Sequence, residues 1–154
     1  MSFIRKAVKV LKQSLWQFPS DLNVLDQVLT SFDQIAQPFI PKPVWLQCQL
    51  ALAEAFTNAV RHAHKDYPPD VTVDIEVTLF AEHLEMRIWD RGANFDLEQL
   101  IEEKTKMVDE DIEGGRGLPI LHQVADKLSY RRTDDNRNCL LLVKHYSDAS
   151  LVEA

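Results

Sequence analysis

The chain contains only four glycines and two cysteines, and both low counts limit the classes of protein to which it can belong. Cys48 and Cys139 stand apart, without a Cys-x-x-Cys pair and without a His and Cys spacing typical of zinc ligands. This excludes a small domain held together by disulfides or zinc and favours a reduced, intracellular protein. No run of about 18 apolar residues occurs, so we expect no segment that crosses a membrane.

Positive charge is also scarce. The 17 Lys and Arg residues face 24 Asp and Glu residues, which leaves a formal net charge of −7. General nucleic-acid binding needs a basic face, so we expect no direct contact with nucleic acid. The basic start, Ser2 to Lys12, lacks the uninterrupted apolar core of a signal peptide, and we therefore expect a cytoplasmic protein.

What the sequence does contain is the periodicity of one globular domain. Its length of 154 residues and hydrophobic content of 45% suit a single core. Alternating apolar residues and turn signals predict strands at about 13–18, 71–79, 84–90, 128–133 and 138–146. Residues 4–11 fit either a short amphipathic helix or a lead-in to the first strand, and the acidic segment 97–113 reads as part helix and part loop.

Apolar residues at helical spacing predict three helices. The first follows Ser20, which we expect to be its N-cap, and continues to Ile35. The second covers about 44–64, and the third runs from Gly114 through Lys127. Helices placed on one face of a mostly antiparallel sheet make an α+β fold, a two-layer sandwich.

The second predicted helix carries a carboxylate and a carboxamide, Glu54 and Asn58, in an otherwise apolar run. Residues four apart lie on the same helix face, and both groups are costly to desolvate without a partner. Carboxylate and amide oxygens that converge on one spot suit a hard cation and a proton transfer. A polar stripe that simply faces water explains the pair equally well when the helix is taken alone.

All four glycines lie in two motifs further along the chain. In the first, Asp90-x-Gly92 at a strand end, the carboxylate can accept from an exocyclic amine such as adenine N6, and an Asx turn is the structural alternative. In the second, Gly114-Gly115-Arg116-Gly117 at a helix entrance, backbone N–H groups can approach an anion closely, with Arg116 as a phosphate contact. A flexible linker is the structural alternative for this second motif.

Together these motifs resemble the N, G1 and G2 boxes of the GHKL (Bergerat-fold) ATPase superfamily. The three boxes are, in order, Glu54-x-x-x-Asn58, Asp90-x-Gly92 and Gly115-x-Gly117. Within the superfamily the chain is most similar to bacterial anti-sigma-factor serine/threonine kinases, through residues 57–63, 95–96 and 114–118. The resemblance runs from about residue 13 to 146, so we expect one GHKL-type domain over 1–154.

The resemblance implies binding of ATP and Mg²⁺. It makes Glu54 the general base and Asn58 the Mg²⁺ ligand, while Asp90 binds the adenine amine and Gly92 leaves room for the ring. It assigns the phosphates, beneath a lid over 96–114, to Gly115, Arg116 and Gly117. Arg61 and His62 are either supporting contacts or surface side chains. Many relatives carry a second G1 glycine where this chain has Asn94, a residue type that tolerates positive φ.

The function that the resemblance implies is an anti-sigma factor with serine/threonine kinase activity. Its expected partners are a sigma factor, which it holds inactive, and a STAS-type anti-sigma-factor antagonist, which it phosphorylates; the family often works as a dimer. A second hypothesis is a nucleotide-gated binding module that sequesters its partner without phosphoryl transfer, and Glu54 favours the enzyme over this module. The third is an α+β scaffold whose glycine motifs are coincidental.

Overall fold

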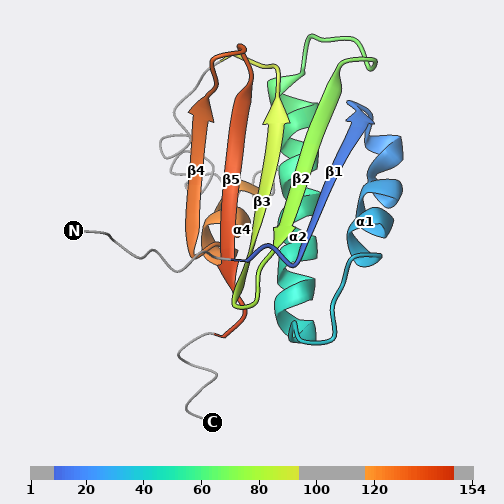
Figure 1. Ribbon diagram of the computed structural model, residues 1–154. Helices are drawn as coiled ribbons and strands as arrows, with labels where there is room; N and C mark the ends of the chain where they lie inside the picture. Colours follow the sequence, from blue (N-terminus) through green and yellow to red (C-terminus); the bar gives the residue numbers. More distant parts are fainter. Residues whose placement is uncertain (1–8, 94–116, 148–154) are drawn as a thin grey trace, which may run out of the picture.

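The computed structural model describes residues 9–93 and 117–147, which build one sheet covered by helices (Figure 1). The five strands are β1 (Lys12–Pro19), β2 (Thr72–Leu79), β3 (His83–Asp90), β4 (Lys127–Arg132) and β5 (Asn138–His145). They lie in the order β1-β2-β3-β5-β4, and every neighbouring pair is antiparallel. The described part of the chain contains no helix that is long and apolar enough to cross a membrane.

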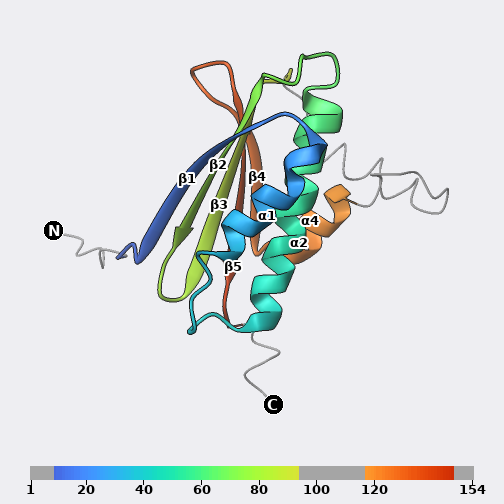
Figure 2. The same ribbon diagram turned by 90° about the vertical axis from the view of Figure 1, so that its right-hand side faces the viewer.

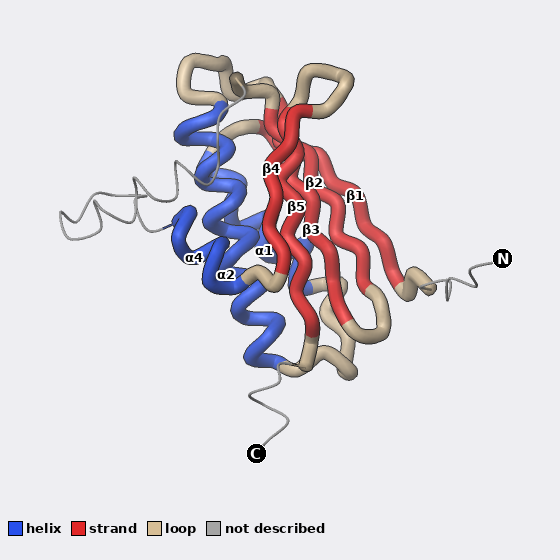
Figure 3. Tube along the Cα trace, turned by 90° about the vertical axis from the view of Figure 1, so that its left-hand side faces the viewer, coloured by secondary structure: helices blue, strands red, loops and turns tan. Residues whose placement is uncertain are grey.

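The helices all lie on one face of this sheet (Figures 2 and 3). They are the short 3-10 helix η1 (Leu22–Val24), α1 (Leu25–Asp33), α2 (Lys42–Asn58), the π-helix η2 (Ala59–Ala63) and α4 (Gly117–Val124). Helix α2 is central, with α1 packed on one side and α4 on the other. The α+β two-layer sandwich predicted from the sequence is therefore confirmed.

The core lies between the sheet and α2, because one face of each element is apolar. Along β3 the buried residues alternate with partly exposed ones, as a pleated strand with one covered face requires. Cys48, Leu52 and Phe56 repeat every four residues on α2 and are fully buried. Burying side chains of this size contributes about 1.5–3 kcal/mol each. Phe32 of α1 stacks on Trp45 of α2 and joins the two helices.

The structure corrects the predicted start of the first helix, the geometry at the end of the second and the end of the third. Asp21, rather than Ser20, caps the first helical turn, since its side chain accepts a hydrogen bond from the Asn23 N–H. The second helix changes from α to π geometry at Ala59. The third ends at Val124, because Lys127 already belongs to β4. The alternatives for residues 4–8 and the acidic segment 97–113 lie outside the described residues.

Strand β2 is covered more completely than its alternating sequence predicts. Asp74 and Thr78 lie on its polar face, yet both are buried. Asp74 is buried because Arg137, from the β4–β5 turn, reaches across the sheet and donates to its Oδ2 at 2.8 Å. The guanidinium of Arg137 also lies 5.2 Å from the ring centre of Trp89. This cluster fastens the β4–β5 turn to the middle of the sheet.

Candidate functional site

Glu54 and Asn58 lie in the last turns of α2, one helical turn apart, as their spacing predicts. Both side chains are partly buried. Among the described residues, neither makes a hydrogen bond or an ion pair with another side chain or with the backbone of another element. Their oxygens are therefore available to a ligand, although they lie on a helix whose opposite face is fully packed.

Asp90 ends β3 and is almost completely buried, with 4% of its surface exposed. Its Oδ1 accepts from the backbone N–H of Gly92 at 2.9 Å and from Asn138 Nδ2 at 2.8 Å. Its Oδ2 accepts from the hydroxyl of Tyr130 at 2.6 Å. Since a carboxylate can accept about four hydrogen bonds, this arrangement leaves capacity for one further donor. The Asx turn expected as the structural alternative is present, and it also fixes the carboxylate.

Tyr130 stays a hydrogen-bond donor at neutral pH. Burial raises the pKa of its hydroxyl far above the usual value of 10, and the hydrogen bond to Asp90 raises it further. The protonated hydroxyl and the ionised carboxylate are complementary, so Tyr130 holds Asp90 in one orientation. Sequence reasoning missed Tyr130, because it lies 40 residues from Asp90 on a strand that does not pair with β3.

Asn138 is the second residue that sequence reasoning missed, and it is fully buried. It is paired with Asp90 across β3 and β5, and its amide nitrogen donates to Asp90 and to the carbonyl of Gly92, at 2.8 Å each. Its Oδ1 accepts from Arg132, whose Nη1 also donates to the Gly92 carbonyl at 2.7 Å. The backbone and side chain of the Asp90–Gly92 turn are thus held from β5 and β4.

Gly92 is required by a close approach between two backbones. A Cβ atom placed on it would lie 2.6 Å from the carbonyl oxygen of Ala63 and 2.9 Å from its Cβ. Because the nearest atom belongs to the backbone of the π-helix, no side-chain rotation could relieve the clash. The glycine therefore brings the end of β3 against the end of the helix that carries Glu54 and Asn58. Its role toward an adenine ring stays a prediction.

His64 joins the same two elements with its side chain. Its Nε2 accepts from the backbone N–H of Arg91 at 2.8 Å, and its Nδ1 lies 2.9 Å from Ser20 Oγ. A backbone N–H can only donate, so Nε2 carries no proton and Nδ1 donates to the serine. Burial is the main cause that lowers the pKa of His64; the Asp90 carboxylate opposes this shift and Arg91 adds to it. The imidazole is therefore neutral in the folded protein.

Near this helix end, sequence reasoning missed His64, which is buried in the junction with the Asp90–Gly92 turn. For Arg61 and His62 it left open a supporting contact or a surface side chain; His62 is exposed and Arg61 is partly buried. The only sequence signal for His64 was its position in the apolar repeat of the helix. That repeat assumes α geometry, whereas the π-helix turns residue 64 to a different side, so the repeat did not predict its burial.

The glycine motif expected to hold phosphates is only partly described. Gly117 is the first residue of α4, in agreement with a glycine at a helix entrance. Gly115, Arg116 and Asn94 lie outside the described residues, as does the expected lid. Helix α4 packs alongside α2, so Gly117 opens a helix that neighbours the one carrying Glu54 and Asn58 (Figure 2).

Comparison with known proteins gives three informative similarities. Residues 18–144 match the sequence profile of the histidine kinase-like ATPase domain. The chain is 35% identical over 83 residues to the serine-protein kinase RsbW of Oceanobacillus iheyensis, across 51% of this chain and 52% of that protein. It is 32% identical over 112 residues to the RsbW of Listeria monocytogenes, across 68% of each chain.

A solved structure agrees with the fold. The crystal structure of the RsbU and RsbW domains of a Mycobacterium tuberculosis protein superposes with a TM-score of 0.61 at 14% sequence identity. The superposition covers 90% of this chain and 34% of that one. The match with the Oceanobacillus kinase spans about half the length of that relative, and the match with the Listeria kinase spans about two thirds.

Proposed function

Because this chain belongs to the histidine kinase-like ATPase family and has serine-protein kinases among its relatives, we propose that it is an ATP-dependent serine/threonine protein kinase. Its proposed role is that of an anti-sigma factor, which sequesters a sigma factor and phosphorylates a STAS-type antagonist. The proposed unit is a single domain over residues 1–154 that acts in the cytoplasm, as a dimer, without direct contact with nucleic acid or membrane.

The observation that carries this proposal is Glu54 at the end of α2, partly buried and without a protein partner among the described residues. A carboxylate paired with Lys or Arg would be a structural residue, whereas one left accessible beside a half-buried amide is suited to accept a proton. Asn58 lies one turn further along the same face. The pair therefore supports chemistry at this helix end and favours an enzyme over a module that only binds.

The adenine half of the proposed site is built around Asp90. Three hydrogen bonds from Tyr130, Asn138 and the Gly92 backbone orient its carboxylate before any ligand arrives. An acceptor that is already oriented loses little entropy on binding, and it remains able to take a hydrogen from an exocyclic amine. A guanine base presents a carbonyl at the same place, which would face the carboxylate without a shared hydrogen.

The residues present fit a Mg²⁺ ion bound together with nucleotide. Within the described ranges, no three His, Cys, Asp or Glu residues come together as a complete protein-made metal site. Magnesium commonly needs only one or two side-chain oxygens, with the substrate's phosphates and water completing its shell. Asn58 would supply such an oxygen, and the ion would neutralise charge on the phosphates. Gly115, Arg116 and Gly117 are proposed to hold the phosphates with backbone N–H groups and the guanidinium.

In the proposed reaction, Glu54 accepts the proton of a serine or threonine hydroxyl on the partner. The hydroxyl oxygen forms a bond with the γ-phosphorus, while the bond from that phosphorus to the β–γ bridging oxygen breaks and ADP leaves. Nearly all of the required work is positioning and charge stabilisation, which suits a small domain with few reactive side chains. The acceptor protein must therefore bring its hydroxyl to the end of α2.

The test is transfer of labelled γ-phosphate from ATP to candidate STAS-type proteins by the wild type and by Glu54→Gln. Glutamine keeps the shape of the side chain but cannot act as the base, and loss of a positioned base costs about 10²–10⁴-fold in rate. We expect Glu54→Gln to transfer phosphate that much more slowly while it binds Mg·ATP almost as the wild type does. Glu82→Gln, at an exposed glutamate in the β2–β3 turn, is the matched control.

The outcomes test the role of Glu54 and separate the two functional hypotheses. Slow transfer by Glu54→Gln alone supports the kinase with Glu54 as its base. Transfer at the parental rate would remove Glu54 from the mechanism. If the wild type transfers no phosphate but retains partners only in the presence of ATP, the nucleotide-gated binding module replaces the kinase.

A further inference from the structure

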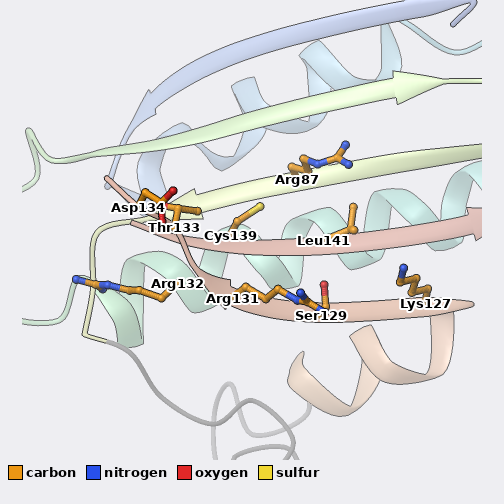
Figure 4. Close-up of a pocket in the computed structure, with 9 residues that line it drawn as sticks. All are labelled: Arg87, Lys127, Ser129, Arg131, Arg132, Thr133, Asp134, Cys139 and Leu141. Atoms are coloured by element: carbon orange, nitrogen blue, oxygen red, sulfur yellow. The ribbon is translucent and has the colours of Figure 1, made fainter. Parts of the chain in front are cut away.

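The face of the sheet opposite the helices carries a basic cavity of about 570 Å³ (Figure 4). It lies over β3, β5 and β4, where no described helix covers the sheet. Four cationic side chains line it, namely Arg87, Lys127, Arg131 and Arg132. Cys139 and Leu141 of β5 lie between the cations of β3 and β4, as the labelled side chains show.

The strand period explains why the cations gather here. Lys127, Ser129 and Arg131 are alternate residues of β4, so their side chains leave the sheet on the same side. In the antiparallel register, Arg131 is opposite Cys139 and Ser129 is opposite Leu141, which is in turn opposite Arg87 of β3. Three neighbouring strands therefore contribute side chains to one concave surface.

Two of the four cations already have partners within the fold. Arg87 is 3.0 Å from Glu85 and 3.5 Å from Glu76, and Arg132 donates to the Gly92 carbonyl. Lys127 and Arg131 are exposed, and within the described part of the chain their side chains form no hydrogen bond or ion pair. One carboxylate, Asp134, lines the cavity. The cavity thus holds a local positive excess on a chain whose net charge is −7.

The distance between Lys127 and Arg131 indicates which kind of ligand the cavity can bind. Residues four apart on a strand are separated by about 13 Å, which is too far for both to grip a single small anion with ease. The same spacing matches two carboxylates four residues apart on another extended chain. No aromatic side chain lines the cavity to stack on a base, and the net charge of the chain repels a polyphosphate backbone.

We propose that this cavity binds an acidic, extended segment of a partner protein, with its carboxylates on Lys127 and Arg131. The charge of the cavity is complementary to such a segment, and its lining of Ser129, Cys139 and Leu141 is small or apolar enough to accept the intervening side chains. The cavity and Glu54 lie on opposite faces of the sheet. A partner held here leaves the proposed nucleotide site open.

The experiment is a titration of the ¹⁵N-labelled full chain with a short peptide of alternating Glu and Thr at low ionic strength, where exposed ion pairs are least screened. We expect amide shifts to concentrate on β4 and β5 and binding to weaken with added salt. Lys127→Gln combined with Arg131→Gln should weaken binding about five- to tenfold, as expected for two ion pairs at a partly exposed site. A peptide with Gln in place of Glu should bind the wild type no more tightly than the acidic peptide binds this double variant.

Lys9→Gln combined with Lys12→Gln is the matched control, because it makes the same change in net charge at exposed lysines near the opposite edge of the sheet. It should change the affinity by less than about twofold. Equal weakening by both double variants would mean a response to overall charge and would overturn the proposal. It would equally fail if the shifts fell on the helical face, or if an oligothymidine bound more tightly than the acidic peptide.

Discussion

The carboxylate of Asp90 shows how one side chain is prepared for a ligand. Its partners Tyr130 and Asn138 come from two other strands, and each supplies a donor to a different carboxylate oxygen. An exposed aspartate would lose bound water and side-chain conformational freedom on binding a ligand, whereas Asp90 is already desolvated and held in one conformation. The free-energy cost of desolvating Asp90 therefore falls on folding, because a buried carboxylate is stable only while its hydrogen-bond donors are present.

Asn138→Ala should therefore destabilise the fold by about 1–3 kcal/mol, since it leaves buried acceptors on Asp90 and Gly92 with fewer donors. Urea denaturation measures the change in the free energy of unfolding. Asn23→Ala, at an exposed asparagine in η1, is the matched control and should have little effect. Equal effects of the two substitutions would show that the buried network contributes nothing beyond an ordinary surface residue.

His64 makes the stability of the fold depend on pH. The folded protein keeps its imidazole neutral, with a pKa below the ordinary value of 6.5. As the pH falls through about 6.5, the unfolded chain binds a proton that the folded chain does not, so folding stability decreases. We expect His64→Gln, whose amide oxygen can still accept from Arg91, to lose this part of the pH dependence.

Denaturation at about pH 7.5 and pH 5.5 measures the effect, and the decrease should be smaller in His64→Gln by up to about 1 kcal/mol. His122→Gln, at an exposed histidine of α4, serves as the control. If His122→Gln reduces the pH dependence as much as His64→Gln does, the buried imidazole is not its source.

Between elements, the informative contact is the one that joins the end of β3 to the end of the helix formed by α2 and η2. The strands and the start of α2 could be predicted because their apolar periodicity is local, as in the alternation of β3. The contacts of Asn138, Tyr130 and His64 could not, because each depends on strand register or on π geometry rather than on neighbours in sequence. Sequence reasoning therefore found Asp90 and missed the residues that orient it.

Gly92→Ala should test this junction. The added Cβ meets the Ala63 backbone at 2.6 Å, so β3 and η2 must separate. We expect a loss of about 1–3 kcal/mol in the free energy of unfolding, together with weaker binding of ATP, because the Asp90 turn moves with Gly92. Ala93→Ser adds one atom at the exposed neighbouring residue and should change neither quantity. An unchanged ATP affinity in Gly92→Ala would show that this junction does not position the nucleotide site.

Across the whole molecule, the sheet divides two kinds of surface. Its helical face holds the core and the candidate site, while its open face carries the basic cavity (Figure 3). The net charge of −7 argued only against general nucleic-acid binding, and it gives no sign of the local basic surface that Lys127 and Arg131 create. Net charge is a sum over the whole chain, and only the strand register shows which charged side chains lie next to one another.

Nucleotide binding should stabilise the entire fold, because ATP binds the folded chain alone. At about 100 times its dissociation constant, a ligand adds about 2.7 kcal/mol, which for a domain of this size corresponds to a rise of roughly 5–10 °C in Tm. We expect Mg·ATP to give such a rise in a thermal melt and Mg·GTP at the same concentration to give much less, since guanine presents a carbonyl to Asp90 where adenine presents an amine. Equal rises would remove the adenine assignment from Asp90.

The π-helix η2 has a consequence for chain length. The backbone N–H of His64 donates to the carbonyl of Ala59 at 2.9 Å, so this turn holds one residue more than an α-helical turn. Deleting a single residue between Ala59 and His64 would turn this contact into the ordinary α-helical hydrogen bond between residues four apart, so the helix would continue as α with the histidine in nearly the same place. The histidine would then keep its contacts with Ser20 and Arg91. A one-residue gap at this point in a related sequence is therefore expected to go with an unbroken α-helix that still ends in a histidine at this junction.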